Sequence, residues 1–574
     1  MNQLFDSRDP FYRRPAGAVE EKTRIHFKIR LPRDLRCSAA YLLVQDDKSK
    51  NDMVSSMFWC GMDGDGHEFW ECDFAPPEAG LYWYRFELET CRGRMPLLKR
   101  EGGKGALSSG TFWQLTVYEK GFQTPDWLCG GIFYQIFPDR FYRPEGPVNN
   151  PFQDRTIRED WGGQPYWRPN GQGKMTNSDY FGGTLRGIEE KLPYLKSLGV
   201  NCIYLNPIFE AHSNHRYNTA DYLKTDPALG TEEDFCRLIN AAQMQGIGII
   251  LDGVFSHTGD DSVYFNAKHR YNTVGAQNSD TSVYRSWYKF GNYPTGYACW
   301  WGVPSLPETD EEDLSFSNFI TGENGVLRYW LKKGIRGWRL DVADELPDSF
   351  LDRIRLAIKA EGRENYLLGE VWEDASNKVS YGALREYFLG SELDATMHYP
   401  FRTAVLDFLL GKIRAQAACD VFWTIQEHYP KENLYAALNL IGSHDRARVL
   451  TVLGGDVNAL KMAMFLQFAL PGVPSIYYGD EAGMTGGTDP YNRGSFPWGK
   501  GNAPLTDFVR SLTAMYQETP LLRRGECEML FFGENVLGCR RFDESGSVLA
   551  LVNRGEEAVE CFGVTVPGRG YVLE

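Results

Sequence analysis

The chain has 574 residues and a net charge of −15, with 43% hydrophobic, 24% charged and 14% aromatic residues. This length is enough for two or three domains, and the composition is that of a folded protein rather than a disordered one. The acidic charge argues against nucleic acid or an anionic membrane as partner and leaves neutral ligands favoured, among them sugars, whose flat faces stack on aromatic rings.

The N-terminal residues lack the apolar run of a signal peptide, and the 12 cysteines include no CxxC pair. We therefore expect a reducing, cytoplasmic location. No stretch of about 18 apolar residues occurs, so no membrane-spanning helix is expected.

The first part of the chain alternates apolar and polar residues with period two, for example over residues 23–29, 40–44 and 80–88. Turn-forming residues such as those at 63–66 separate these runs. The pattern predicts an N-terminal β-sandwich over residues 1–122. The proline-containing segment 121–127 is the predicted linker.

Beyond the linker, short apolar runs alternate with amphipathic stretches such as 187–198 and 231–245. This alternation predicts a (β/α)₈ TIM barrel over residues 123–522. A stretch rich in Tyr, Trp, Asn and Gly, residues 258–320, is too long for an ordinary loop and predicts a B subdomain inserted after the third strand. Short strands near the end predict a C-terminal β-sandwich over residues 523–574. The expected barrel strands are residues 132–137, 202–205, 247–254, 337–342, 366–371, 396–400, 438–441 and 473–478.

Three carboxylates, Asp341, Glu370 and Asp445, directly follow strand-like runs. The carboxyl ends of barrel strands are where such folds place their chemistry, and two carboxyl groups facing a sugar ring suffice to cleave a glycosidic bond. Arg339 lies two residues before Asp341 on the same strand face, so we expect it to keep Asp341 ionised. Glu370 follows an apolar run, a dry setting that favours its protonated form.

Four segments in a fixed order carry a specific resemblance: DGVFSH at 252–257, GWRLDVADE at 337–345, GEVW at 369–372 and IGSHD at 441–445. With them, the chain resembles the α-amylase family of glycoside hydrolases (family 13), and within it the neopullulanase, cyclomaltodextrinase and maltogenic amylase group. The resemblance implies retaining hydrolysis of α-glucosidic bonds in maltooligosaccharides and cyclodextrins, and in some members of pullulan or starch. The substrate is then an α-glucan oligosaccharide.

The same resemblance implies Asp341 as nucleophile, Glu370 as general acid/base and Asp445 as the third acid, which binds the distorted sugar. Double displacement requires the carboxyl groups of Asp341 and Glu370 to lie roughly 5–6 Å apart. For Trp372, core packing is an equal alternative to stacking against a sugar. For Asp489 and Arg493, a surface ion pair is the alternative to contact with a sugar. The implied substrate-binding residues are Tyr217, His257, Arg339, His444, Trp372, Asp489 and Arg493.

Two departures from the family bear on metal binding. Ser256 stands where α-amylases commonly have a calcium-binding asparagine, and Thr184 where the neopullulanase group often has a calcium-ligating aspartate. We therefore expect no required cofactor, since a hard cation needs several charged oxygens. The remaining weak calcium candidates are Asn149, Asn150 and Asp154.

A third departure is Arg446, just after Asp445, where the family usually has a small polar residue. A cation there either tightens or crowds the binding subsite. Two alternative functions also stay open: a chain that is mainly an α-glucan transglycosylase, and a non-catalytic glucan-binding protein of the same fold. Buried acids that cost stability argue against the second. The resemblance also predicts a homodimer formed through the N-terminal domain. Glucan binding and stabilisation of the barrel are the alternative roles of that domain.

Overall fold

The computed structural model describes residues 3–166 and 176–574. Their contacts divide the chain into two compact units. The first unit comprises Met1–Gln123, Glu373–Asp394 and Asp420–Leu434, and the second comprises Thr124–Trp372, Ala395–Cys419 and Tyr435–Glu574. Two segments from the range predicted for the barrel therefore cluster with the N-terminal strands.

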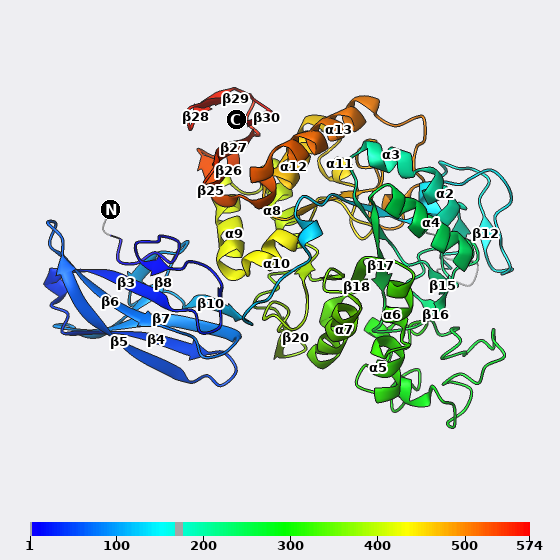
Figure 1. The fold of residues 1–574 in the computed structure, drawn as a ribbon, viewed down its shortest axis with the longest axis horizontal. Coiled ribbons are helices and arrows are strands. Elements are labelled where there is room, and N and C mark those ends of the chain that lie inside the picture. Colours follow the sequence, from blue (N-terminus) through cyan, green and yellow to red (C-terminus); the bar gives the residue numbers. More distant parts are fainter. Residues whose placement is uncertain (1–2, 167–175) are drawn as a thin grey trace. The chain divides into compact units, whose positions relative to one another are not determined.

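The first unit contains the predicted β-sandwich, drawn in blue in Figure 1. Its strand order is β1-β3-β6-β5-β4-β7-β10-β2, and β8 and β9 extend the sheet from β7. Strand β5 pairs with β4 over its first half and with β6 over its second half, so it joins the two layers. The side chains between the layers, including Phe27, Tyr84 and Trp113, are fully buried.

The strands of the first unit have these bounds: β1 Arg13–Arg14, β2 Val19–Glu20, β3 Ile25–Pro32, β4 Ala39–Asp46, β5 Asp52–Met62, β6 His67–Phe74, β7 Gly80–Thr90, β8 Gly93–Lys99, β9 Gly105–Leu107, β10 Trp113–Tyr118, β20 Val379–Ser380 and β21 Ala383–Leu384.

In the second unit, eight parallel strands form a sheet in the order β22-β19-β18-β17-β14-β11-β24-β23. A parallel bridge between Met397 and Leu438 joins its two ends and closes the barrel. The predicted (β/α)₈ barrel is therefore confirmed. Its strands are β11 Phe133–Ile136, β14 Cys202–Leu205, β17 Gly248–Gly253, β18 Gly337–Leu340, β19 Tyr366–Gly369, β22 Ala395–Thr396, β23 Leu438–Leu440 and β24 Val473–Tyr477.

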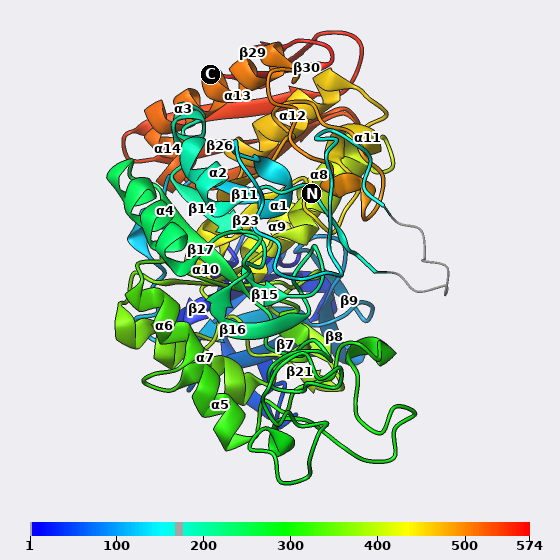
Figure 2. The same cartoon turned by 90° about the vertical axis from the view of Figure 1, so that its right-hand side faces the viewer.

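Helices follow the strands along the chain and pack around the sheet (Figure 2). They are α1 Pro138–Phe141, α2 Leu185–Glu190, α3 Leu192–Ser197, α4 Glu232–Met244, α5 Leu314–Thr321, α6 Val326–Lys332, α7 Asp348–Glu361, α8 Tyr399–Leu409, α11 Val449–Val452, α12 Val457–Ala469, α13 Ala503–Glu518 and α14 Pro520–Arg524. Most residues of α9 Ala415–His428 and α10 Lys431–Ala436 belong to the first unit.

Prolines explain two differences from the predicted elements. The single helix expected over residues 187–198 is wrong, because Pro193 in the first turn of α3 cannot continue the ladder of α2. The strand expected over residues 396–400 is wrong beyond Thr396, because Pro400 lies in the first turn of α8, where a proline is well tolerated.

A long stretch without helices longer than one turn follows β17, as predicted for the insertion. It contains the 3₁₀ turns η3 (Arg285–Trp287) and η4 (Trp300–Gly302), and its end pairs with its beginning through a bridge between His257 and Glu308. Helix α5 begins at Leu314, inside the range predicted for the insertion. Asp313 determines this start, because its side chain accepts hydrogen bonds from the first backbone N–H groups of the helix.

Thr309 joins the insertion to the segment just after β17, and it contacts the buried carboxyl group of Glu311. Thr309 Oγ1 donates its only proton to the backbone oxygen of Phe255 at 2.6 Å, so its 3.0 Å contact with Glu311 Oε1 needs a proton from Glu311. Burial raises the pKa of Glu311 to about 8. The carboxyl group is therefore neutral at pH 7 and donates to Thr309.

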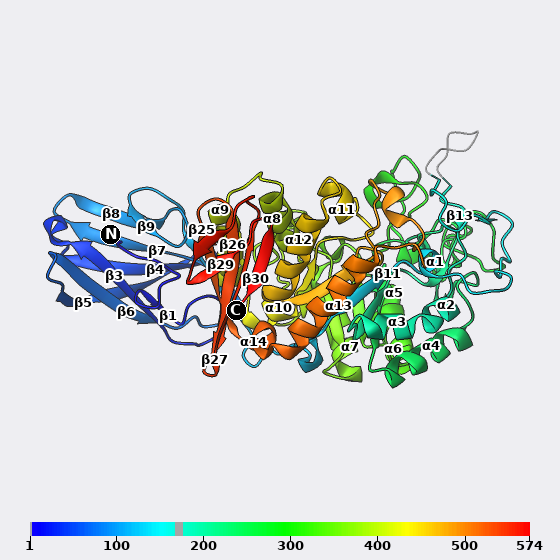
Figure 3. The same cartoon turned by 90° about the horizontal axis from the view of Figure 1, so that it is seen from above.

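The C-terminal strands form a four-stranded antiparallel sheet in the order β25-β26-β27-β30, with the hairpin β28–β29 beside it. Leu551, Cys561 and Val566 belong to the small core that this sheet and the hairpin share. Helix α12 packs against β27 and β30 (Figure 3). The strands are β25 Glu526–Phe532, β26 Val536–Asp543, β27 Gly546–Asn553, β28 Val559–Cys561, β29 Val564–Val566 and β30 Gly570–Leu573.

Two short strand pairs complete the second unit: β12 Thr156–Ile157 with β13 Asp179–Tyr180, and β15 Phe209–Ala211 with the longer β16 Thr219–Thr225. Over residues 3–166 and 176–574, no helix combines the length and the apolar character that crossing a bilayer requires.

The neutral state of Glu311 predicts a pH-dependent effect of Glu311→Gln. Between its ordinary pKa of 4.5 and its folded pKa of about 8, the folded protein keeps a proton that the unfolded chain has released, so the native protein loses stability as pH rises. The loss is at most about 1.4 kcal/mol per pH unit. A glutamine donates to Thr309 at any pH, so the variant should gain stability relative to the native protein across this range.

Melting temperatures of both proteins between pH 5 and pH 8 measure this difference. Glu308→Gln, on a half-exposed carboxylate that pairs with Lys289, is the matched control. Parallel pH curves for the native protein and Glu311→Gln would show that Glu311 is ionised in the folded state.

Candidate active site

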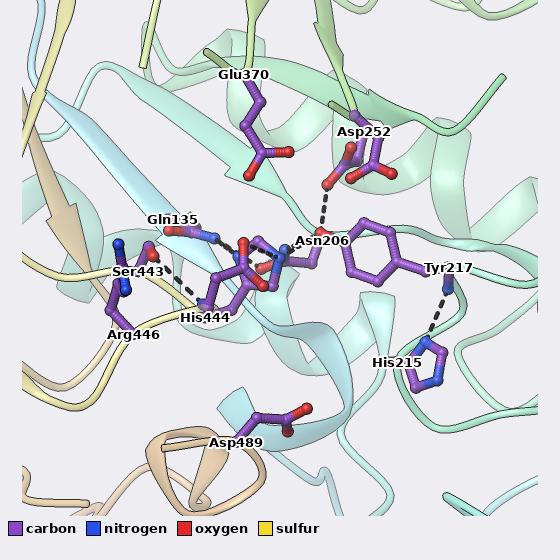
Figure 4. Close-up of polar contacts among 12 residues, drawn as sticks. Gln135, Asn206, His215, Tyr217, Asp252, Glu370, Ser443, His444, Arg446 and Asp489 are labelled. Carbon is purple, nitrogen blue, oxygen red and sulfur yellow. Dashed lines mark hydrogen bonds and ion pairs between the residues drawn. The ribbon is translucent and has the colours of Figure 1, made fainter. Parts of the chain in front are cut away.

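Polar side chains gather at the carboxyl ends of the barrel strands (Figure 4). Asp252 lies near the end of β17, Arg339 lies in β18, and Asp341 and Glu370 directly follow β18 and β19. Because parallel strands end at the same edge of the barrel, the alternation of apolar runs with acids brings these side chains together. The structure thus unites the predicted acids of the second and third motifs.

One guanidinium group, that of Arg339, contacts three carboxylates. Its Nη1 donates to Asp252 Oδ1 at 2.7 Å and to Asp341 Oδ1 at 2.8 Å. Its Nη2 lies 2.7 Å from Glu370 Oε2, an ion pair that lacks hydrogen-bond direction and therefore acts through charge. Asp341 and Glu370 are consequently within about 8 Å of each other, because their oxygens contact neighbouring nitrogens of one planar group.

Glu370 is held at both carboxylate oxygens. Oε2 accepts a hydrogen bond from the backbone N–H of Val342, and Oε1 accepts one from Trp372 Nε1, each at 2.9 Å. The side chain is 4% exposed. The carboxyl group is therefore fixed in one orientation before any substrate binds.

The electrostatics of the cluster correct one prediction. The contact between Arg339 and Asp341 is present, but burial raises the pKa of Asp341 well above its ordinary value, and the charges of Glu370 and Asp252 add to the rise against Arg339. Burial likewise raises the pKa of Asp252. Burial next to other carboxylates therefore favours the protonated forms of Asp341 and Asp252.

A hydrogen-bonded chain connects His444 to this cluster. Gln135 Nε2 donates to His444 Nδ1 at 2.8 Å, so the network assigns the proton of His444 to Nε2, which lies 2.5 Å from Tyr217 Oη. The Tyr217 hydroxyl donates to Asp252 Oδ2 at 2.8 Å (Figure 4). The rings of Tyr217 and His444 stack at 5.3 Å. Burial lowers the pKa of His444 well below its ordinary value, which keeps the ring neutral.

His257, the other predicted histidine, forms a hydrogen bond with the backbone of Tyr217. Its Nε2 donates to the backbone oxygen of Tyr217 and its Nδ1 accepts from Ser256 Oγ, both at 3.1 Å. Burial lowers the pKa of His257 to about 4. Both ring nitrogens thus already have protein partners, so the structure links His257 to the position of Tyr217.

Asp445 is joined to the network at its two oxygens. Oδ2 lies 3.2 Å from His444 Nε2, and Oδ1 lies 3.5 Å from Arg493 Nη2. Arg493 also contacts the exposed Asp489 at 3.0 Å, so it bridges the two acids. In Figure 4, Asp489 lies apart from the cluster around His444. The ion pair that was the alternative for Asp489 and Arg493 is therefore present, and it extends to Asp445.

Trp372 packs against the site rather than standing free. Its ring stacks on that of Tyr399 with a centroid distance of 4.5 Å, and the guanidinium of Arg446 lies 4.1 Å from its centre. The packing alternative for Trp372 is thus realised. Arg446, the third departure, acts here on an aromatic ring.

The insertion adds a pair of stacked tryptophans beside His257. The ring of Trp300 lies 5.0 Å from that of His257, and Trp301 stacks on Trp300 at 4.6 Å. Trp301 has a φ of +48° and is 71% exposed. Its Nε1 donates to Glu345 Oε1 at 2.9 Å, which ties the pair to the segment that follows Asp341.

Among the calcium candidates, Asn150 Oδ1 is buried without a hydrogen-bond partner in the described part of the chain, but the only carboxylate already has a cationic partner. Asp154 is ion-paired with Arg270, whose Nε also contacts Asp261 at 3.1 Å. Asn150 Nδ2 donates to a backbone oxygen at 3.4 Å. Thr184 caps α2. Within the described residues, no group of three or more His, Cys, Asp or Glu side chains is arranged to hold a metal ion.

Sequence reasoning missed several residues of the network. Asp252 stands at a strand end within a motif that the sequence analysis quoted, so the rule that singled out the other acids also applies to it. The remaining ones carry no signal of their own, because single polar residues in apolar strands are common: Gln135, Tyr204 and Asn206, which bind His444, Asp252 and Tyr217 respectively.

Comparisons with known proteins agree with this arrangement. The family pattern described as "Alpha amylase, catalytic domain" matches residues 135–504. An amylopullulanase of Thermoanaerobacterium saccharolyticum is 36% identical over 602 residues, which cover 93% of this chain and 46% of that protein. A cyclomaltodextrinase of Geobacillus thermopakistaniensis (strain MAS1) is 35% identical over 451 residues, which cover 76% and 71% of the two chains.

Among solved structures, the ligand-free cyclic alpha-maltosyl-(1→6)-maltose hydrolase from Arthrobacter globiformis matches with a TM-score of 0.70 and 32% identity, covering 79% of this chain and 99% of that one. The chain spans less than half the length of the amylopullulanases it matches.

The pairing of Asp154 with Arg270 predicts that chelation has no effect. A guanidinium already neutralises the one carboxylate among the calcium candidates, so treatment with EDTA should leave the melting temperature and the activity unchanged. Calorimetric scans with and without EDTA, each repeated after adding calcium, measure this. A lower melting temperature that calcium restores would reveal a metal site elsewhere in the chain.

Proposed function

Because the chain belongs to the α-amylase family, we propose that it is a retaining hydrolase of α-glucosidic bonds in maltooligosaccharides and cyclodextrins. The names of its relatives support this substrate class, since they include a cyclomaltodextrinase and a cyclic alpha-maltosyl-(1→6)-maltose hydrolase of known structure. The proposal rests mainly on one observation. The guanidinium of Arg339 contacts Asp252, Asp341 and Glu370, so the proposed nucleophile, Asp341, and the proposed acid/base, Glu370, are neighbours.

In the first step, Asp341 attacks the anomeric carbon and forms a covalent glucosyl ester. The bond from that carbon to the glycosidic oxygen breaks, and Glu370 gives its proton to the departing oxygen. Arg339 balances the carboxylate that remains on Glu370. In this assignment Asp341 must hold its attacking oxygen as a carboxylate when the substrate is bound.

In the second step, Glu370 takes a proton from a water molecule, which attacks the anomeric carbon and releases Asp341. Asp445 and His444 bind hydroxyl groups of the sugar at the cleavage point, and Tyr217 stacks beneath its ring. His257 acts on Tyr217, whose backbone it holds. If a sugar hydroxyl replaces water in this step, the product is a longer glucan, and product analysis separates the two outcomes.

The homodimer and the cytoplasmic location stay predictions. The N-terminal unit supports the first of these with an exposed apolar row along β5, formed by Val54, Phe58 and Met62, which are 61%, 70% and 49% exposed. Such a row is suited to contact with a second copy of the chain.

The roles of the two acids predict strong effects of isosteric substitutions. Glu370→Gln should lower turnover of maltotriose by about 10²–10⁴-fold, the usual contribution of general acid catalysis. Asp341→Asn should lower it at least as far, because the covalent step is lost. Both variants should keep the native melting profile or exceed its stability, since each removes a buried carboxylate from a crowded anionic cluster.

Steady-state hydrolysis of maltotriose and β-cyclodextrin measures these losses. Asp507→Asn is the matched control, because its carboxylate is 70% exposed and pairs with Arg510 on the surface of α13. Turnover of either site variant within tenfold of the native protein would refute the assignment.

The exposed tryptophan of the insertion predicts a binding effect. A positive φ at a residue other than glycine costs on the order of 1–3 kcal/mol, and the hydrogen bond to Glu345 holds the ring in place despite it. We expect this ring to stack on a sugar beyond the cleavage point, so Trp301→Ala should raise KM for long maltooligosaccharides about 3- to 10-fold with little change in kcat.

Trp301→Phe, which keeps an aromatic face, should recover most of this affinity. Alanine has a Cβ like tryptophan, so the strain of the positive φ at this position stays the same in Trp301→Ala. The change in KM then reports the loss of the ring alone. An unchanged KM for maltoheptaose in Trp301→Ala would show that the exposed ring does not contact the substrate.

A further inference from the structure

Arg446 makes an unusual contact beside the proposed acid/base. Its guanidinium carbon lies 4.1 Å from the centre of the Trp372 ring, while the ring of Tyr399 stacks on Trp372 at 4.5 Å with an interplanar angle of 15°. Two planar groups at such short distances cannot share one face of an indole, so they cover opposite faces. Trp372 is therefore clamped between a tyrosine and an arginine.

The clamped indole of Trp372 is connected to Glu370 by a single hydrogen bond. Trp372 Nε1 donates to Glu370 Oε1 at 2.9 Å, and this is the donor opposite the Val342 N–H that binds Oε2. A rotation of the indole would remove the donor from Oε1. The orientation of the proposed acid therefore depends on what holds the indole ring.

The two sides of the clamp differ in how firmly they are fixed. Tyr399 is 2% exposed, lies in the first turn of α8, and has its hydroxyl 3.4 Å from Ser443 Oγ. The backbone oxygen of Arg446 accepts a hydrogen bond from the buried side chain of Asn492 at 2.9 Å. Tyr399 thus forms a fixed floor, and Arg446 closes the open face of the indole.

Charge makes arginine a costly choice at this position. Burial and the charge of Arg446 together lower the pKa of Arg402, which shows that two guanidinium groups repel each other here. The Nε of Arg446 is buried without a hydrogen-bond partner. A cation kept under these conditions needs a compensating interaction, and the stack on Trp372 provides it.

We propose that Arg446 is a positioning residue that presses Trp372 onto Tyr399 and thereby keeps the hydrogen bond from Trp372 Nε1 to Glu370 in place. The inference rests on the proposed role of Glu370 as acid/base. Arg446 has no direct contact with Glu370 among the described residues, so its effect on Glu370 is transmitted through the indole. Its charge also opposes the rise in the pKa of the neighbouring Asp445. The departure at this position then tightens the site and does not crowd it.

The test compares two leaving groups. Cleavage of maltotriose expels a sugar alkoxide, which must receive a proton, whereas α-maltosyl fluoride expels fluoride, which needs none. Arg446→Ala should lower kcat/KM for maltotriose about tenfold or more, a part of the roughly 10²–10⁴-fold supplied by general acid catalysis. Its kcat/KM for α-maltosyl fluoride should stay within about twofold, because this constant reports only the glycosylation step.

Two further variants sharpen the result. Trp372→Phe keeps the stacked ring but lacks the N–H group, so it should reproduce the selective loss even if Arg446→Ala folds poorly. Arg446→Lys keeps a cation over the ring and should restore much of the maltotriose activity. Together they separate the hydrogen bond from the packing.

Equal losses on both substrates in Arg446→Ala and Trp372→Phe would overturn the proposal, because a general disturbance of the site does not distinguish leaving groups. Unchanged activity of both variants on maltotriose would overturn it as well. Failure of the proposed function gives a different result: the native protein itself would cleave neither maltotriose nor α-maltosyl fluoride.

Discussion

The buried guanidinium of Arg339 is the constraint on which the rest of the site depends. Its side chain is fully buried, and Asp252, Asp341 and Glu370 reach it from three neighbouring strands of the barrel. Asp252 and Arg339 are partners in the register of β17 with β18. Side chains alternate across a strand, so a shift of this register by one residue would turn an acid away from the cation and leave a buried charge unpaired. The geometry of the acids and the closure of the barrel therefore stabilise each other.

Around this cluster the protein arranges neutral polar groups in a fixed direction. Gln135 donates to His444, His444 faces Tyr217, and Tyr217 donates to Asp252. In this series each donor fixes which atom of the next side chain carries the proton, so all the hydrogen bonds run in one direction, from Gln135 to Asp252. Burial keeps the histidine uncharged. The network consequently orders the ring that we assign to sugar stacking without adding charge to a site that already holds three acids.

Local pattern and tertiary contact explain what the sequence predicts and what it does not. The strand ends were predictable because apolar runs of four to six residues punctuated by acids are a local signal, and the contact of Arg339 with Asp341 was predictable because residues two apart share a strand face. The reach of Arg339 to Asp252 and Glu370 was not, since it depends on the register between strands. The direction of the Asp341 pKa was missed because burial arises from packing across the barrel. The pairing of Asp154 with Arg270 joins residues 116 positions apart, and no local pattern marks it.

The insertion shows how the site is extended without disturbing its charge balance. Its attachment after the third strand uses Thr309, which contacts Glu311, and His257. Burial raises the pKa of Glu311 to about 8 and lowers that of His257 to about 4, so both side chains tend to be neutral. An ionised carboxylate in either place would add to the repulsion among the acids around Arg339, while a cation would compete with Arg339 for them. Neutral groups that still donate and accept hydrogen bonds avoid both effects. The exposed Trp301 can therefore be carried to the edge of the site on a scaffold that the proposed catalytic charges do not perturb.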